Sequence, residues 1–155
     1  MARRKRPERR EILPDPVHES LLVAKFINNI MRSGKRGTAE RIFYTALEKM
    51  EKQSGKDGLE LFEKAIENAS PILEVKSKRI GGATYQVPVE VSNDRKKALA
   101  MRWLIAGAKG RGGRPMSDRL AEEFLAASKG EGGAVRKKEE VHRMAEANRA
   151  FAHFR

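Results

Sequence analysis

The sequence predicts a mainly α-helical protein of about six helices, with an inserted two-stranded β-ribbon and an extended basic N-terminal arm. Apolar residues recur every three or four positions through most of the chain, which is the helical period. Over one stretch, at about residues 72–91, the pattern instead alternates with a period of two, as in paired β-strands. The first eighteen residues instead combine three prolines with a run of arginines. We therefore expect an arm over residues 1–18 and one helical domain over residues 19–155.

The arm has a dense positive charge, with a single acid, Glu8, in its first ten residues. Its bases are Arg3, Arg4, Lys5, Arg6, Arg9 and Arg10. Pro7, Pro14 and Pro16 disfavour a helix here. A segment of this composition cannot bury enough apolar surface to fold alone. We expect it to bind phosphate groups, the plainer alternative being a solvated terminus.

The first helix is expected to begin at Ser20 and to end at Gly34. Its apolar stripe consists of Leu22, Val23, Phe26, Ile27, Ile30 and Met31. A turn over residues 34–37 should follow. Because both flanking helices commit their apolar faces to a core, Lys35 and Arg36 should point outward from this turn.

Two more helices precede the ribbon. Thr38 can cap the second helix, and Gly55 closes it. Asp57 or Gly58 opens the third, which must end before Pro71. The third helix lies in an acid-rich stretch and is expected to face solvent.

The ribbon is expected to turn at Gly81-Gly82, because glycines suit the tight turn between two β-prone runs. Pro88 cannot donate a hydrogen bond to a strand ladder, so its strand must have an open edge. No further run with strand alternation is visible. The basic residues of the ribbon are Lys76, Lys78 and Arg79.

Three helices should follow the ribbon. The fourth begins at residues 92–94 and runs to about Lys109, and a basic loop over residues 110–115 follows it. The fifth ends before Gly130, and the sixth runs from Ala134 towards His153. The basic residues of this half include Arg95, Arg102, Arg111, Arg114, Arg119, Arg136, Lys137 and Lys138.

The composition limits the classes of function that the protein can have. Lys and Arg number 33 against 21 Asp and Glu, a net charge of +12, which favours a polyanion as partner. There is no cysteine, and no apolar run approaches the ~20 residues of a membrane span. The basic N-terminus has no apolar segment behind it, so we expect no secretory signal and a cytoplasmic protein.

Catalysis is not expected. The histidines are His18 in the arm, and His142 and His153, which would lie about three helical turns apart, too far to share one ion. No phosphate-binding glycine motif ends in Lys-Ser or Lys-Thr. We therefore expect no catalytic residue, no metal, no cofactor and no small-molecule substrate.

The pattern favours phosphate contacts to shaped RNA over base stacking, because few aromatic residues lie among the basic clusters. The sequence Gly107-Ala108-Lys109-Gly110 matches the glycine loop of KH domains, which clamps nucleotides. A KH domain also needs three strands. This match therefore indicates a helix end followed by a basic loop.

Several motifs together resemble one family, bacterial small-subunit ribosomal protein seven. They are the pattern from Ser20 to Ala46 with Gly34-Lys35-Arg36 inside it, the hairpin run 74–88, the segment 144–151, and Leu13-Pro14-Asp15-Pro16 in the arm. The loop over residues 107–115 departs from the family in its many glycines. The resemblance extends from the arm to the last residue.

The resemblance implies a structural protein that binds the 3′ major domain of small-subunit ribosomal RNA and nucleates assembly of the head. It implies a place near the decoding centre, with the ribbon at exit-site tRNA, messenger RNA nearby, and ribosomal proteins nine and eleven as neighbours. By position, the basic residues named above should hold ribosomal RNA. Those facing tRNA or messenger RNA would be Gly81, Gly82, Ala83, Arg143 and Asn148.

Two other classes remain open. A DNA-architectural protein could use the ribbon as a DNA-wrapping arm, but such arms usually carry an apolar wedge at the tip. Here the tip is Gly-Gly. A helical module that binds other proteins would leave the charge of +12 unexplained.

Overall fold

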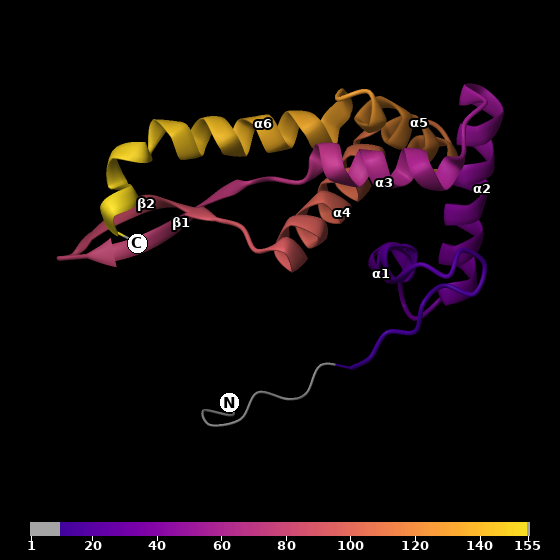
Figure 1. Cartoon of the computed structure of the whole chain (residues 1–155), viewed down its shortest axis with the longest axis horizontal. Coiled ribbons are helices and arrows are strands. Elements are labelled where there is room, and N and C mark those ends of the chain that lie inside the picture. The colour runs from indigo at the N-terminus through magenta and orange to yellow at the C-terminus, as the bar shows by residue number, and fades with distance from the viewer. Residues whose placement is uncertain (1–9, 155) are drawn as a thin grey trace. The chain divides into compact units, whose positions relative to one another are not determined.

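The computed structural model describes residues 10–154 (Figure 1). The chain divides into two compact units, residues 1–40 and residues 41–155. Arg3 to Arg9 of the predicted arm lie outside the described residues. The arm boundary at residue 18 therefore stays a prediction.

In the first unit, a turn precedes the first helix. The carboxylate of Asp15, which is buried, accepts hydrogen bonds from the backbone N–H groups of Val17 (3.2 Å) and His18 (3.1 Å). A short acidic side chain often stabilises a turn in this way, by bonding to the backbone two or three residues later. Residues 16–18 therefore form a turn just before the first helix.

Helix α1 (Leu21–Ile30) begins where the sequence predicts, because the Ser20 hydroxyl accepts a hydrogen bond from the N–H of Val23 (3.5 Å). It ends earlier than expected. The backbone leaves the helical conformation at Met31, whose ψ is 136°, and the positive φ angles of Ser33 (51°) and Gly34 (72°) prevent the helix from resuming. The expectation that the helix continues to Gly34 was therefore wrong by about one turn.

Helix α2 (Arg36–Ser54) starts two residues before the predicted cap at Thr38. Arg36 and Gly37 belong to its first turn, which leaves only Lys35 of the basic pair in the connection. Helix α3 (Gly58–Ala69) begins as predicted. The Asp57 carboxylate accepts a hydrogen bond from the N–H of Leu59 at 3.0 Å.

The ribbon has the predicted antiparallel topology. Strand β1 (Leu73–Ile80) pairs with β2 (Ala83–Glu90), and the pairing of Ile80 with Ala83 leaves Gly81 and Gly82 as a two-residue turn. Both glycines have positive φ, 57° and 90°, as such a turn requires. Within residues 10–154 these are the only two strands.

Helix α4 (Asn93–Gly110) has Ser92 as its N-cap, and α5 (Met116–Ser128) follows the loop. Gly107 to Gly110 lie in the last turns of α4, so the KH-like match is a helix end. Helix α6 (Gly132–Ala147) begins two residues before the predicted Ala134. The expectation that it continues towards His153 was wrong, because it ends at Ala147 with Asn148 as its C-cap, and a 3₁₀ helix, η1 (Arg149–Phe154), follows.

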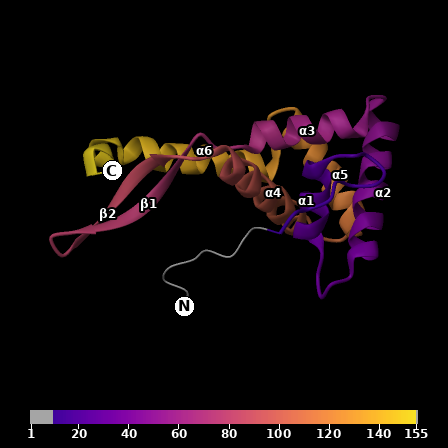
Figure 2. The same ribbon diagram turned by 60° about the horizontal axis from the view of Figure 1, so that its bottom comes forward.

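The core of the second unit is centred on three phenylalanines from α2, α3 and α5. Phe43, Phe62 and Phe124 are fully buried, and their ring centroids lie 5.1–6.3 Å apart in edge-on geometry. Such aromatic pairs add about 0.5–1.5 kcal/mol each beyond the burial of area. This cluster fixes the helices from which the ribbon and α6 project (Figure 2).

A buried carboxylate joins α5 to the start of α6. Glu123 is 1% exposed, and its Oε1 accepts a hydrogen bond from the N–H of Ala134 at 2.9 Å. Its Oε2 lies 2.9 Å from both Nε and Nη2 of Arg111. A negative charge at a helix N-terminus is stabilising. Glu123 therefore acts as a cap for α6 supplied by a neighbouring helix.

The other end of the α6 segment lies along the ribbon (Figure 1). Nε2 of His142 accepts a hydrogen bond from the N–H of Ile72 at 3.0 Å, just before β1 begins. Burial lowers the pKa of His142, and the nearby charge of Lys138 lowers it further. Beyond the end of α6, η1 bends onto the ribbon and packs against β2.

Candidate nucleic-acid interface

A row of positive side chains follows one face of α4. Arg95, Arg102 and Lys109 are exposed and stand seven residues apart, which is close to two helical turns. The opposite face of the helix, with Ala100 and Leu104, is buried. Arg95 and Arg102 were predicted from the sequence but Lys109 was not, although its spacing of seven residues from Arg102 could have revealed it. A row of one sign on one face is suited to the backbone of a nucleic acid.

The row meets the ribbon at Glu74. Nε of Arg95 lies 2.9 and 2.8 Å from the two carboxylate oxygens of Glu74, and Nζ of Lys76 lies 3.2 Å from one of them. Burial raises the pKa of Glu74, but the hydrogen bonds and charges of Arg95 and Lys76 outweigh it, so the pKa lies below its ordinary 4.5. Glu74 thus holds two predicted RNA-binding residues side by side.

Charge continues along the ribbon towards its tip. Nζ of Lys78 donates a hydrogen bond to the carbonyl of Phe154 at 2.6 Å, and Arg79 is exposed on the other face. At the tip, Gly81, Gly82 and Ala83 are exposed. A Cβ placed on either glycine would have no atom within 4 Å, so the tip is open to close approach by another molecule.

The first unit presents its own cations. Lys35 is exposed, and Arg36 forms an ion pair with Glu40 at 2.8 Å within the first turn of α2. The exposed Lys25 and Arg32, on and just after α1, are also seven residues apart. Neither of these two residues was predicted from the sequence. Arg10 is exposed; the arm residues Arg3, Arg4, Lys5, Arg6 and Arg9 lie outside the described residues.

Three candidates in and after the basic loop have partners within the protein. Arg111 binds the buried Glu123, and Arg114 forms an ion pair with Glu122. Nη1 of Arg119 donates a hydrogen bond to the carbonyl of Arg111 at 3.1 Å. Their contact with RNA stays a prediction, but the structure gives Arg111 and Arg119 a role in holding the α4–α5 connection.

The basic run of α6, residues 136–138, likewise contains side chains that have partners within the protein. Arg136 is exposed, whereas Lys137 pairs with Glu140 at 2.8 Å and Lys138 donates a hydrogen bond to the carbonyl of Asn68 at the end of α3. The hydrogen bond from Lys137 lowers the pKa of Glu140.

The two residues at the end of α6 that were expected to face tRNA also differ in whether they have a partner within the protein. Arg143 is exposed. The side-chain amide of Asn148 donates a hydrogen bond to the carbonyl of Met144 at 2.7 Å and so closes the end of the helix.

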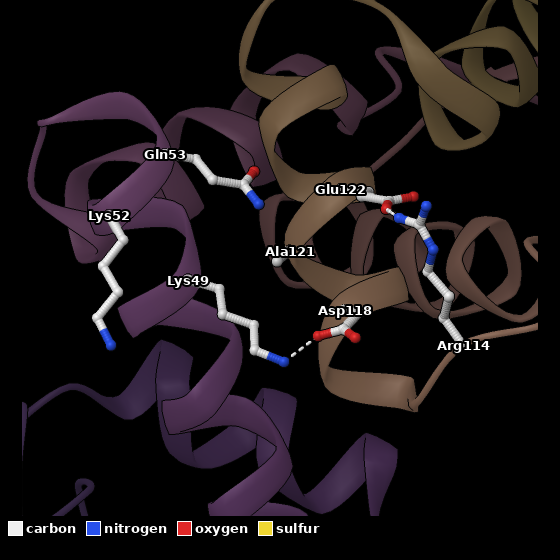
Figure 3. A pocket seen from close by; sticks show the side chains of 7 residues that line it. All are labelled: Lys49, Lys52, Gln53, Arg114, Asp118, Ala121 and Glu122. Carbon is white, nitrogen blue, oxygen red and sulfur yellow. Dashed lines mark hydrogen bonds and ion pairs between the residues drawn. The ribbon is translucent and has the colours of Figure 1, made fainter.

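A pocket of about 430 Å³ between α2 and α5 is lined by paired charges (Figure 3). Lys49 pairs with Asp118, and Arg114 pairs with Glu122. Every acid in its lining is thus bonded to a base.

Among residues 10–154, no group of three or more His, Asp or Glu side chains could hold a metal ion. In the same range, no helix is both long and apolar enough to cross a membrane.

The fold and the surface define a class: a helical RNA-binding protein with a β-ribbon. The model of the family "Ribosomal protein S7p/S5e" matches residues 2–149 of this sequence. The chain belongs to that family. It is therefore a structural, non-enzymatic component of the small ribosomal subunit, with ribosomal RNA as its partner.

Curated relatives are similar to this chain over nearly its full length. The chain is 58% identical over 153 residues to the small ribosomal subunit protein uS7 of Pseudothermotoga lettingae, which covers 99% of both chains. It is 57% identical to uS7 of Oleidesulfovibrio alaskensis, over 95% of this chain and 94% of that one. It is 54% identical to uS7 of an Anaeromyxobacter species, over 100% and 99% respectively.

Proposed function

We propose that this protein binds the 3′ major domain of small-subunit ribosomal RNA directly and nucleates assembly of the head of the cytoplasmic ribosome. The observation that carries the proposal is the basic row of α4, which meets the ribbon where Arg95 and Lys76 share the carboxylate of Glu74. Arg102, Arg95 and Lys76 follow one another from helix to strand. Ribosomal RNA in A-form presents its phosphates at the rims of its grooves, where such a surface can contact them.

The proposal includes a second contact, between the ribbon tip and tRNA at the exit site, near the decoding centre. At ~3.3 Å per residue, eight-residue strands extend about 26 Å. This reach and the open glycine turn support contact with a second molecule beyond the ribosomal RNA. Messenger RNA would pass nearby, and ribosomal proteins nine and eleven would be neighbours.

Chemical footprinting of small-subunit ribosomal RNA tests the first contact. Protection should be confined to the 3′ major domain, and replacing Arg102 and Lys109 with Ala should weaken it. Protection spread evenly over the RNA would contradict the proposal.

Replacing residues 80–83 with a shorter turn tests the second contact. Binding to isolated ribosomal RNA should be unchanged, while retention of tRNA at the exit site should change. Unchanged retention in normally assembled subunits would show that the tip does not contact tRNA. Failed assembly would show that the ribosomal-RNA surface extends to the tip.

A DNA-architectural role is the second candidate, and the position of Pro88 argues against it. A ribbon that kinks DNA usually carries an apolar wedge at its tip. Pro88 instead lies opposite Val75 near the base of the ribbon, and it is buried. Salt-dependent competition between structured ribosomal RNA and duplex DNA separates the two functions.

A further inference from the structure

Aromatic rings from distant parts of the sequence meet on one face of the ribbon. The ring of Tyr85, in β2, lies 5.3 Å from that of Phe151 and 5.0 Å from that of Phe154, both in η1. The ring of His153 lies 4.0 Å from that of Phe154. Figure 1 shows how the chain bends after α6 and brings η1 to the strands. The sequence indicated no such cluster.

These rings differ in burial from the core aromatics. Phe43, Phe62 and Phe124 are fully buried, as expected of rings that only fill a core. Tyr85, Phe151 and Phe154 are each partly exposed, and His153 is exposed. The cluster therefore holds η1 on the ribbon and also presents aromatic surface to solvent.

The surroundings of the cluster are positively charged. Lys78 stands opposite Tyr85 in the strand register, and its ammonium group binds the carbonyl of Phe154. Residues 76–87 contain three bases and no acid. Arg149 opens η1, and its one ion pair among the described residues, to Glu146 at 3.4 Å, is highly exposed. An exposed pair of this kind is weak, so Arg149 can exchange it for a phosphate.

We propose that Tyr85, Phe151 and Phe154 form a stacking site for an unpaired RNA base, with Lys78 and Arg149 holding the phosphates beside it. Aromatic rings interleaved with cations are the means by which proteins bind single strands without reading sequence. This site adds recognition of single-stranded RNA to the proposed function. It does not depend on the glycine tip, because the cluster lies on the stem.

The probe that isolates stacking is a labelled octamer of adenosine compared with an octamer of the same sugar and phosphate units without bases. Both have the same charge, so phosphate contacts contribute equally to their binding. The full-length protein should bind the adenosine octamer roughly tenfold more tightly, which is the usual effect of stacking one base on an aromatic ring. Equal affinities would overturn the proposal.

Two variants test which aromatic residues stack on the base. Phe151→Leu keeps an apolar side chain against Tyr85 but removes the ring, so it should reduce the preference for adenosine. Trp103→Leu removes the partly exposed ring of the single Trp, on α4, and should leave the preference unchanged. The reverse result would place stacking on α4 and overturn the proposal.

A measurement on the unmodified protein covers the case in which a variant fails to fold. Adenine stacking should shift the ring proton resonances of Tyr85 and Phe151 upfield when the adenosine octamer is added. Ring resonances that do not move while the octamer binds would overturn the proposal.

A final comparison identifies the source of the base. Assembled small subunits with Phe151→Leu are probed with base-specific reagents, first alone, then with messenger RNA, and then with exit-site tRNA. The condition in which a base gains reactivity names the RNA that occupies the site. No gain in any condition would show that the site is unused in the ribosome and overturn its assignment to ribosomal function.

Discussion

Glu123 occupies the space that a side chain at position 107 would need. A Cβ added to Gly107 would lie 2.6 Å from Oε1 and 2.8 Å from Cδ of Glu123. A Cβ at Gly133 would in turn lie 3.2 Å from the Cα of Gly107. The close approach of α4 and α6 therefore depends on glycines, and the buried carboxylate fills the gap that they leave.

Gly107→Ala should destabilise the protein. The new methyl group would force apart Glu123 and the start of α6, and overpacking of this kind costs about 1–3 kcal/mol. Gly110→Ala is the matched control, because it lies in the same helix with no atom within 4 Å of its Cβ. Urea unfolding should show a loss for the first variant and no loss for the second. Equal stabilities would show that the helices can separate at no cost.

Stability should also depend on pH through His142. As an acceptor from the N–H of Ile72, Nε2 must be unprotonated, and burial lowers the pKa of the ring below its ordinary 6.5 in the folded protein. The unfolded chain therefore takes up a proton first as the pH falls. The stabilisation is complete above about pH 6.5, and it is lost as the pH falls from there through the lower pKa of the folded state.

His142→Gln separates this effect from other titrations. Glutamine does not titrate, and its amide oxygen can accept the same hydrogen bond. The free energy of unfolding, measured by urea between pH 7.5 and 5.5, should fall less steeply in the variant than in the natural chain. If the variant and the natural chain show the same slope, His142 is not the titrating group.

Helix and strand positions follow from the sequence here because the decisive signals are local. The hydroxyl of Ser20, the carboxylate of Asp57 and the turn at Gly81-Gly82 each act within a few residues. The start of α2 at Arg36 was missed because Gly37 weakens the helical signal without preventing the helix. The end of α6 was missed because η1 is held by Tyr85, which no local pattern reveals.

The candidate interface was predictable in composition but not in detail. Arg95 and Arg102 were named from the sequence, and the structure places both on the exposed face of α4. Sequence alone could not show that Arg111 binds Glu123, since that pair depends on how α5 packs against the end of α4. Lys138 is similar, because its partner is a backbone carbonyl at the end of α3. Partners that are distant in sequence decide which cations remain available for RNA.

Lys35 and Arg36 should contribute to RNA binding and little to stability. The ion pair between Arg36 and Glu40 joins an exposed arginine to a partly exposed glutamate one helical turn away, and such a pair is worth about 0.3–0.5 kcal/mol. The double change to Ala should weaken RNA binding by more than about 1 kcal/mol, since two charged contacts are lost. The control, Lys52→Ala with Lys56→Ala, removes two exposed lysines from an acid-rich stretch. A lower melting temperature with unchanged RNA affinity would make the pair structural.

Replacing Arg102 with Ala and replacing Arg111 with Ala should have opposite effects, the first on RNA affinity and the second on stability. Arg102 is exposed and makes no ion pair with any residue from 10 to 154, so its loss should leave stability unchanged. Removing one phosphate contact should lower RNA affinity and reduce the salt slope of binding by about one.

Arg111→Ala instead leaves the carboxylate of Glu123 buried with only the N–H of Ala134. Breaking a fully buried pair costs about 3–5 kcal/mol. The side chain of Arg111 is 34% exposed, so solvent screening reduces the expected loss to about 1–3 kcal/mol. Urea unfolding and RNA titration at several salt concentrations, on both variants, measure the two effects. If Arg111→Ala keeps its stability and lowers the salt slope, Arg111 belongs to the RNA surface, and Glu123 is satisfied without it.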